Sequence, residues 1–145
     1  MNKFEFFHGA VLVKIIHSGL FKKFEIATES NTTYILDDKI GLYIKYSRNR
    51  MPPWIFTFKE NHVKDIKGIN DLFGNVFITL VCNDDGICCI DWNEFSTIIS
   101  VENNDYPKWI KSSRKKGEKY FVSGKDSILD HKIGNSDFPK KLKIF

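Results

Sequence analysis

Length, composition and charge narrow the class of protein before any motif is considered. The chain has 145 residues, of which 42% are hydrophobic and 14% aromatic, so it can fill one core and is not a disordered chain. Its formal net charge is +4. Its apolar runs fall far short of the roughly 20 residues that cross a bilayer, and Glu5 interrupts the N-terminal apolar stretch. We therefore expect one domain over residues 1–145, in the cytoplasm and without membrane contact.

The positive charge is concentrated in the last third of the chain. Residues 1–100 carry 11 Lys and Arg against 12 Asp and Glu, whereas residues 101–145 carry 11 against 6. An anionic partner such as DNA or RNA is consistent with this uneven distribution, and a solubilising surface accounts for it equally well.

Apolar spacing predicts a helix followed by strands in the first part of the chain. Phe7, Val11 and Ile15 recur at helical spacing, which predicts a helix over 4–17 that Gly19 ends. Alternating apolar and polar residues then predict strands at 22–28, 34–36, 40–46 and 54–58. In 40–46, one face carries Ile40, Leu42, Ile44 and Tyr46, and the other carries Gly41, Tyr43 and Lys45.

A second helix and a buried hairpin are predicted in the middle of the chain. The stretch 60–73 has a helical period that Gly74 ends. Residues 76–82 are apolar nearly throughout, which is typical of a central strand covered on both faces. Asp84-Asp85-Gly86 predicts a turn into a return strand over 87–90.

The last part of the chain reads as a short helix and a small β region. Asp91 and Glu94 have the spacing of a capping box at a helix start. Strands are predicted near 109–110 and over 119–124, with a return over 127–133.

These elements predict an α+β fold with a single mixed sheet. The strand 76–82 would be central, with the helices 4–17 and 60–73 packed on the sheet. The small C-terminal β region would lie at one edge.

The order helix, three strands, helix, strand resembles the core of the restriction-endonuclease-like nucleases of the PD-(D/E)xK class, over about residues 4–90. Those enzymes hold a divalent ion between an acid before one strand and a second acid two positions before a lysine. The resemblance implies Lys45 as this lysine, Asp37 or Asp38 as the first acid, and Mg²⁺ or Mn²⁺ as the ion.

The motif is matched only in half, because Tyr43 stands two positions before Lys45, where the class has an acid. A second carboxylate would come from elsewhere, for example from Glu5 or Glu29. Otherwise Lys45 is an exposed strand lysine and the two aspartates before its strand form a turn.

A second resemblance covers most of the chain. The runs FFHGAVL, IGLYIKYS, FTF with the following His62, and VFITLVC with GICCID are similar to a family of small bacterial proteins of uncharacterised function. This resemblance implies a bacterial or phage-related cytoplasmic protein and implies no activity.

Two basic clusters are candidate phosphate contacts. Arg48 and Arg50 follow Lys45 in a loop that ends at Trp54, whose indole could stack on a base or be buried. The second cluster lies at an expected hairpin tip and consists of Arg114, Lys115 and Lys116. Polar connections and solvated turns are the alternatives for both.

The cysteines and histidines are candidate metal ligands and nucleophiles. A turn at Asp85-Gly86 would place Cys82 opposite Cys89 and leave Cys88 on the other face. No Cys-x-x-Cys spacing accompanies them, so buried small side chains are favoured over zinc ligands or a Cys-His pair. His8 lies one turn from Glu5, facing either the Lys45 side of the sheet or solvent.

The function hypothesis joins these observations. We expect a protein that acts on nucleic acid, as a divergent metal-dependent nuclease of a bacterial or phage system. Asp38 would bind the metal, Lys45 would stabilise charge on the scissile phosphate, and Glu5 would supply the missing carboxylate. The alternative is a non-catalytic module that binds another protein through the same face, and the missing acid before Lys45 favours it. The oligomeric state is not predicted.

Overall fold

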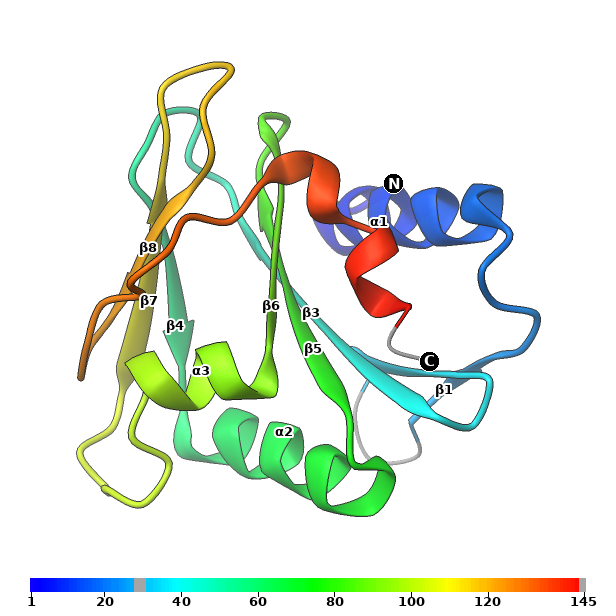
Figure 1. Cartoon of the computed structure of the whole chain (residues 1–145), viewed down its shortest axis with the longest axis horizontal. Helices are drawn as coiled ribbons and strands as arrows, with labels where there is room; N and C mark the ends of the chain where they lie inside the picture. The colour runs from blue at the N-terminus through cyan, green and yellow to red at the C-terminus, as the bar shows by residue number, and fades with distance from the viewer. Residues whose placement is uncertain (28–30, 144–145) are drawn as a thin grey trace.

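The molecule has three layers in the computed structural model, which describes residues 1–27 and 31–143 (Figure 1). A five-stranded sheet lies in the middle, with the helix α1 (Lys3–Ser18) against one face and a three-stranded sheet against the other. The helices α2 (Glu60–Phe73) and α3 (Trp92–Ile98) lie at one end of the space between the two sheets. The helices predicted over 4–17 and 60–73 are thus confirmed.

The central sheet has the strand order β1-β2-β3-β5-β6. β3 and β5 are parallel, and the other neighbours are antiparallel. β5 therefore lies between two strands, and every residue of it is buried, which confirms the prediction of a strand covered on both faces. The bounds of these strands are Phe24–Ile26 (β1), Thr33–Leu36 (β2), Ile40–Ser47 (β3), Val76–Cys82 (β5) and Gly86–Asp91 (β6).

The prediction of a single sheet is wrong, because the chain builds a second sheet from β4 (Trp54–Phe58), β7 (Lys108–Ser113) and β8 (Phe121–Gly124). β7 pairs antiparallel with both of the others. The C-terminal β region consequently covers a face of the central sheet instead of extending its edge. Residues 127–133 contribute isolated bridges and not a further strand.

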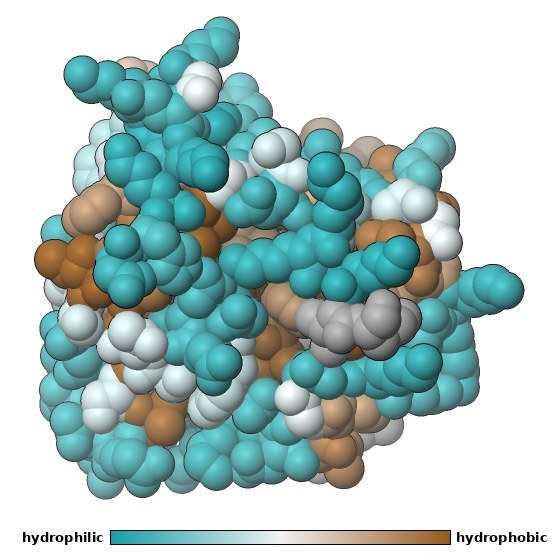
Figure 2. Space-filling model, viewed as in Figure 1, coloured by the Kyte–Doolittle hydropathy of each residue, from teal (hydrophilic) through white to brown (hydrophobic). Residues whose placement is uncertain are grey.

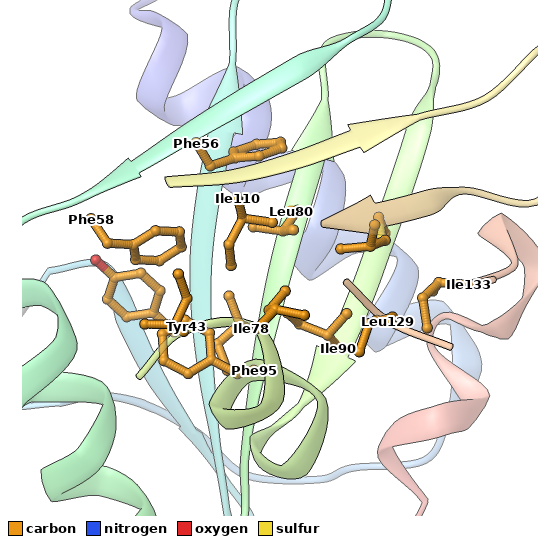
Figure 3. Packing of buried hydrophobic residues seen from close by; sticks show 14 of the residues in the cluster. Tyr43, Phe56, Phe58, Ile78, Leu80, Ile90, Phe95, Ile110, Leu129 and Ile133 are labelled. Carbon is orange, nitrogen blue, oxygen red and sulfur yellow. The ribbon is translucent and has the colours of Figure 1, made fainter. Parts of the chain in front are cut away.

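The packing of the core between the two sheets gives the reason why β4 belongs to the second sheet and not to the central one (Figure 3). Alternate residues of β4 are buried, and Phe56 and Phe58 face Tyr43 and Leu80 of the central sheet within one apolar cluster. Phe95 of α3 packs on the Phe58 ring at 5.5 Å between ring centres. β4 thus supplies an apolar face that covers β3 and β5, which a position within the same sheet would not allow.

The other face of the central sheet is covered by α1 and by the end of the chain. Phe7, Val11 and Ile15 of α1 pack on this face, as their spacing predicted. Two short 3₁₀ turns, η1 (Asn135–Asp137) and η2 (Lys140–Leu142), lie near the end of the described residues, and Phe138, directly after η1, and Leu142, in η2, join the same cluster. Among the described residues, no helix combines the length and the apolar character needed to span a membrane.

The hairpin between β5 and β6 turns earlier than predicted. Asn83 adopts a left-handed conformation (φ 51°), and the Asp85 N–H donates to the Cys82 carbonyl at 3.0 Å. Leu80 consequently pairs with Cys88, so Cys82 and Cys88 share the face between the sheets while Cys89 faces α1. The predicted pairing of Cys82 with Cys89 is wrong, because the closing turn begins one residue after Cys82.

Candidate functional site

The two aspartates of the nuclease hypothesis form the turn between β2 and β3. Asp37 and Asp38 both adopt positive φ, 51° and 55°. The Asp37 carboxylate accepts hydrogen bonds from the backbone N–H groups of Lys22 and Lys23 at 2.9 and 2.7 Å. Asp38 pairs with the Lys23 ammonium at 2.9 Å, a hydrogen bond that lowers the pKa of the Asp38 carboxyl. Both carboxylates therefore have local structural partners.

The structure does not bring Asp38, Lys45 and Glu5 together. Asp38 precedes β3 and Lys45 lies near its far end, a separation of about 20 Å along an extended strand. Lys45 faces the second sheet, whereas α1, which carries Glu5, covers the opposite face. Glu29 lies outside the described residues. Among the residues that the structure describes, no group of three or more His, Cys, Asp or Glu could hold a metal ion.

Lys45 instead forms a pair with His62 at the start of α2. Lys45 Nζ lies 3.2 Å from His62 Nδ1 and 4.8 Å from the centre of the Phe58 ring. The Lys59 backbone N–H donates to the same Nδ1 at 3.0 Å, so this nitrogen is unprotonated and the ring is neutral. Burial lowers the pKa of Lys45 to about 8. Burial and the neighbouring lysines also lower the pKa of His62, so at neutral pH the proton stays mainly on Lys45, which donates to His62 Nδ1.

His8 faces the interior and not the Lys45 side of the sheet. Its Nδ1 lies 2.8 Å from the Tyr34 hydroxyl, and its ring stacks on Phe4 at 3.9 Å between ring centres. Glu5, one turn earlier, is exposed, and its carboxylate accepts from the Asn2 N–H at the helix start. His8 and Glu5 therefore do not form a joint site.

Three turns meet at one end of the molecule and are tied by hydrogen bonds (Figure 1). The Asn83 side-chain amide in the β5–β6 turn donates to the Arg48 carbonyl in the β3–β4 loop at 2.7 Å. Arg114, at the end of β7, donates to the Asp85 carboxylate at 2.7 Å and to the Asp85 carbonyl at 3.0 Å. We call this region, with the loops 48–53, 83–85 and 114–119, the turn end.

Arg114 holds the turn end together and is not the exposed turn residue that the sequence predicted. Its side chain is only 11% exposed, and its guanidinium lies 4.5 Å from the centre of the Tyr120 ring. The Tyr120 hydroxyl donates to the same Asp85 carboxylate at 2.6 Å. Because its guanidinium already donates to Asp85 and Glu118, Arg114 has little capacity left for a phosphate.

A cavity of about 540 Å³ lies beside these turns, and we call it the basic pocket. It lies at the carboxyl ends of β3 and β5, where ligands commonly bind between parallel strands. Arg48 and Arg50 make no ion pair with any described residue. The lining residues are Lys3, Phe7, Arg48, Arg50, Asn83 and Asp84.

Further lysines extend the positive charge along the turn end. Lys115 and Lys116 are exposed at the tip of the β7–β8 hairpin, which Gly117 closes with φ 87°. Figure 2 shows hydrophilic side chains projecting from this part of the molecule. Trp54 does not contribute a stacking surface, because it is 1% exposed and its indole N–H donates to the Asn49 carbonyl at 2.9 Å.

The cysteines are buried and unpaired, as favoured from the sequence. Burial raises the pKa of Cys82 and of Cys89 to about 12, and it also raises the pKa of Cys88 well above its usual value. Thiols that stay protonated at neutral pH are poor nucleophiles and poor metal ligands.

A separate charged cluster anchors the end of the chain. Lys141 donates to Glu94 at 2.7 Å and to the Cys89 carbonyl at 2.9 Å. His131 Nε2 lies 2.5 Å from the other Glu94 oxygen, and this contact raises the pKa of His131. The predicted capping box of Asp91 and Glu94 is confirmed at the start of α3. The same Glu94 carboxylate is thus held in place to pair with Lys141 of η2.

Sequence reasoning found Arg48 and Arg50 but missed the other residues of the basic pocket. Lys3 lies at the start of α1 and Asn83 and Asp84 lie in a distant turn, so only the tertiary fold brings them to the arginines. Comparison of the chain with models of protein families, with curated proteins and with solved structures found no match.

Proposed function

We propose that this protein binds nucleic acid through the phosphate backbone at the turn end. The observation that carries the proposal is the convergence of cations from three distant parts of the chain. Lys3 comes from α1, Arg48 and Arg50 from the β3–β4 loop, and Lys115 and Lys116 from the β7–β8 hairpin. A polyanion such as a phosphate backbone fits a surface on which cations from separate parts of the chain meet.

The hydrogen-bonded ties between the turns support the proposal. Because Asp85 is already neutralised by Arg114, it does not oppose the lysines nearby. Asn83 fixes the loop that carries the two arginines, so these side chains start from an ordered backbone. A cationic surface on fixed turns binds with a smaller loss of conformational entropy than one on free loops.

Salt titrations test the proposal. Fluorescence anisotropy with duplex DNA, single-stranded DNA and RNA should show affinity that falls steeply with salt, since each phosphate contact releases about 0.9 counterions. The double variant Lys115→Gln/Lys116→Gln should lower the slope of log K against log salt by about two. The matched control, Lys14→Gln/Lys132→Gln, removes two exposed lysines outside the turn end and should leave the slope unchanged.

Two outcomes would contradict the proposal. One is no binding of any of the three nucleic acids at low salt. The other is binding whose salt slope falls equally in the turn-end variant and in the control, which would indicate attraction by net charge alone.

Nucleic-acid cleavage is a further step of the hypothesis, and the geometry does not favour it, because Asp38 lies at the other end of β3 from Lys45. Incubation with plasmid DNA and with RNA, with and without Mg²⁺ or Mn²⁺, tests this step directly. Metal-dependent cleavage that Lys45→Ala abolishes would support a nuclease. Without such cleavage, binding is the whole activity.

A protein-interaction module is the second candidate, and one observation favours it. The outer side of α1 exposes Phe6, Val13 and Ile16, each more than half accessible. These residues follow helical spacing with Ala10 between them, so a second copy of the chain could pack helix to helix. Sedimentation velocity tests this: a dimer that Val13→Lys dissociates supports the candidate, and a monomer at high concentration contradicts it.

A further inference from the structure

We propose that the basic pocket binds a terminal phosphate monoester together with the nucleoside that carries it. The inference rests on the proposed function and assigns to the pocket a ligand distinct from the internal phosphodiesters of a strand. The chemical class is a nucleotide with a terminal phosphate, either at one end of a strand or as a free mononucleotide.

The charge of the pocket matches a dianion. Lys3, Arg48 and Arg50 supply three positive charges and Asp84 one negative charge, which leaves an excess of two. A phosphate monoester carries a charge of about −1.5 to −2 at neutral pH, whereas an internal phosphodiester carries one negative charge. Two guanidinium groups without ion-pair partners can also each present a fork of N–H donors to the phosphate oxygens.

The shape of the pocket favours one nucleotide over a continuous strand. Its volume of about 540 Å³ falls within the range of about 300–1,000 Å³ for small-molecule sites. Phe7 and Lys3 of α1 bound it on one side, and the β5–β6 turn bounds it on another. The lysines of the hairpin tip are absent from its lining and would contact the rest of the strand.

The remaining lining residues suit the nucleoside. The Asp84 carboxylate is exposed and has no ion pair with a described residue, so it can accept hydrogen bonds from ribose hydroxyls or from an exocyclic amine. Phe7 is a core residue, 9% exposed, and lines the pocket with the accessible part of its ring, which stacks on Tyr46 at 4.7 Å between ring centres. The pocket therefore pairs a cationic part for phosphate with a part for sugar and base.

Competition binding of matched oligonucleotides tests the inference. Three single-stranded probes of one sequence are compared, with a 5′-phosphate, with a 3′-phosphate and with both ends as hydroxyls. A phosphate at the favoured end should tighten binding by about tenfold or more, as expected for charge-assisted hydrogen bonds. The advantage should shrink between pH 7.5 and pH 5.5, because the monoester loses its second charge near pH 6. A nucleoside monophosphate that displaces the phosphorylated probe would show that the pocket also binds a free mononucleotide.

Variants separate this inference from the proposed function. Arg50→Gln should weaken the favoured phosphorylated probe more than the unphosphorylated probe, so that the preference for the terminal phosphate is lost. Lys115→Gln/Lys116→Gln should weaken all probes alike and keep the preference. Equal affinity for the three probes, with no competition by the mononucleotide, would overturn the inference and leave the proposed function standing. If no oligonucleotide binds, the proposed function fails. Binding of the nucleoside monophosphate would then still support the inference about the pocket, and no binding of it would overturn that inference too.

Discussion

His8 gives the stability of the fold a specific dependence on pH. The side chain is 2% exposed, and its Nε2 has no hydrogen-bond partner among the described residues. Its Nδ1 lies against the Tyr34 hydroxyl, and among the described residues no carboxylate compensates a proton on the ring. Burial accordingly lowers the pKa of His8 from 6.5 to about 4.

The sign of the effect follows from proton linkage. In the unfolded chain His8 takes up a proton near pH 6.5, and in the folded chain only near pH 4. Between these values the unfolded state binds more protons, so the free energy of unfolding falls as the pH falls. Through this titration the free energy of unfolding falls by about 3 kcal/mol in total, and about 2 kcal/mol of this decrease occurs between pH 7 and pH 4.5.

Urea unfolding at pH 7 and at pH 4.5 measures this loss. Carboxylates and the other histidines also titrate in this range. The informative quantity is therefore the difference between wild type and His8→Phe in how far the free energy of unfolding falls. The wild type should lose about 2 kcal/mol more than the variant on acidification. Tyr34→Phe serves as a matched control, because it removes the hydroxyl that contacts His8 and keeps the buried imidazole. Equal losses in wild type and His8→Phe would refute the argument and indicate a solvated His8.

Three further predictions concern the core and Lys45. Lys45→Met should raise the free energy of unfolding at pH 7 by about 1–2 kcal/mol, because the unfolded chain holds this charge more easily than the folded one. The gain should shrink as the pH rises above 8 and vanish above pH 10.5, and a loss of stability at pH 7 would contradict the depressed pKa. Gly41→Ala should cost about 1–3 kcal/mol in the same assay, because the new Cβ would lie 2.0 Å from Ile69 Cγ2. Adding Ile69→Ala should recover part of the cost, and strictly additive effects would contradict the clash. A thiol reagent should modify no cysteine of the native protein and all three in denaturant. Rapid labelling of the native protein would show that the hairpin opens.

The faces of the strands were predictable from the sequence, and their partners were not. The alternation in β3 correctly separates Leu42 and Ile44 from Tyr43, and the structure shows that the first face packs against α1 and the second faces the other sheet. The same alternation in β4 shows that Phe56 and Phe58 share a buried face, and it carries no information about which strand pairs with them. Pairing of β4 with β7 is a long-range choice, settled by how two apolar faces fill one core.

The candidate site shows the same limit. Arg48 and Arg50 stand out because two arginines follow a strand within three positions. The engagement of Arg114 by Asp85 could not be foreseen, because it depends on which hairpin lies beside which turn. A lysine cluster at a turn is visible in a sequence, whereas the ion pairs that neutralise part of it exist only after folding.

The placement of β4 has a consequence for how the chain acquires its structure during synthesis. β4 ends at Phe58, and its partner β7 begins only at Lys108, so the second sheet cannot form until the residues of β7 have also left the ribosome. The core beneath α1 depends in the same way on Phe138 and Leu142, which follow every strand that they cover. A chain interrupted before Lys108 would leave apolar faces on both sides of the central sheet uncovered.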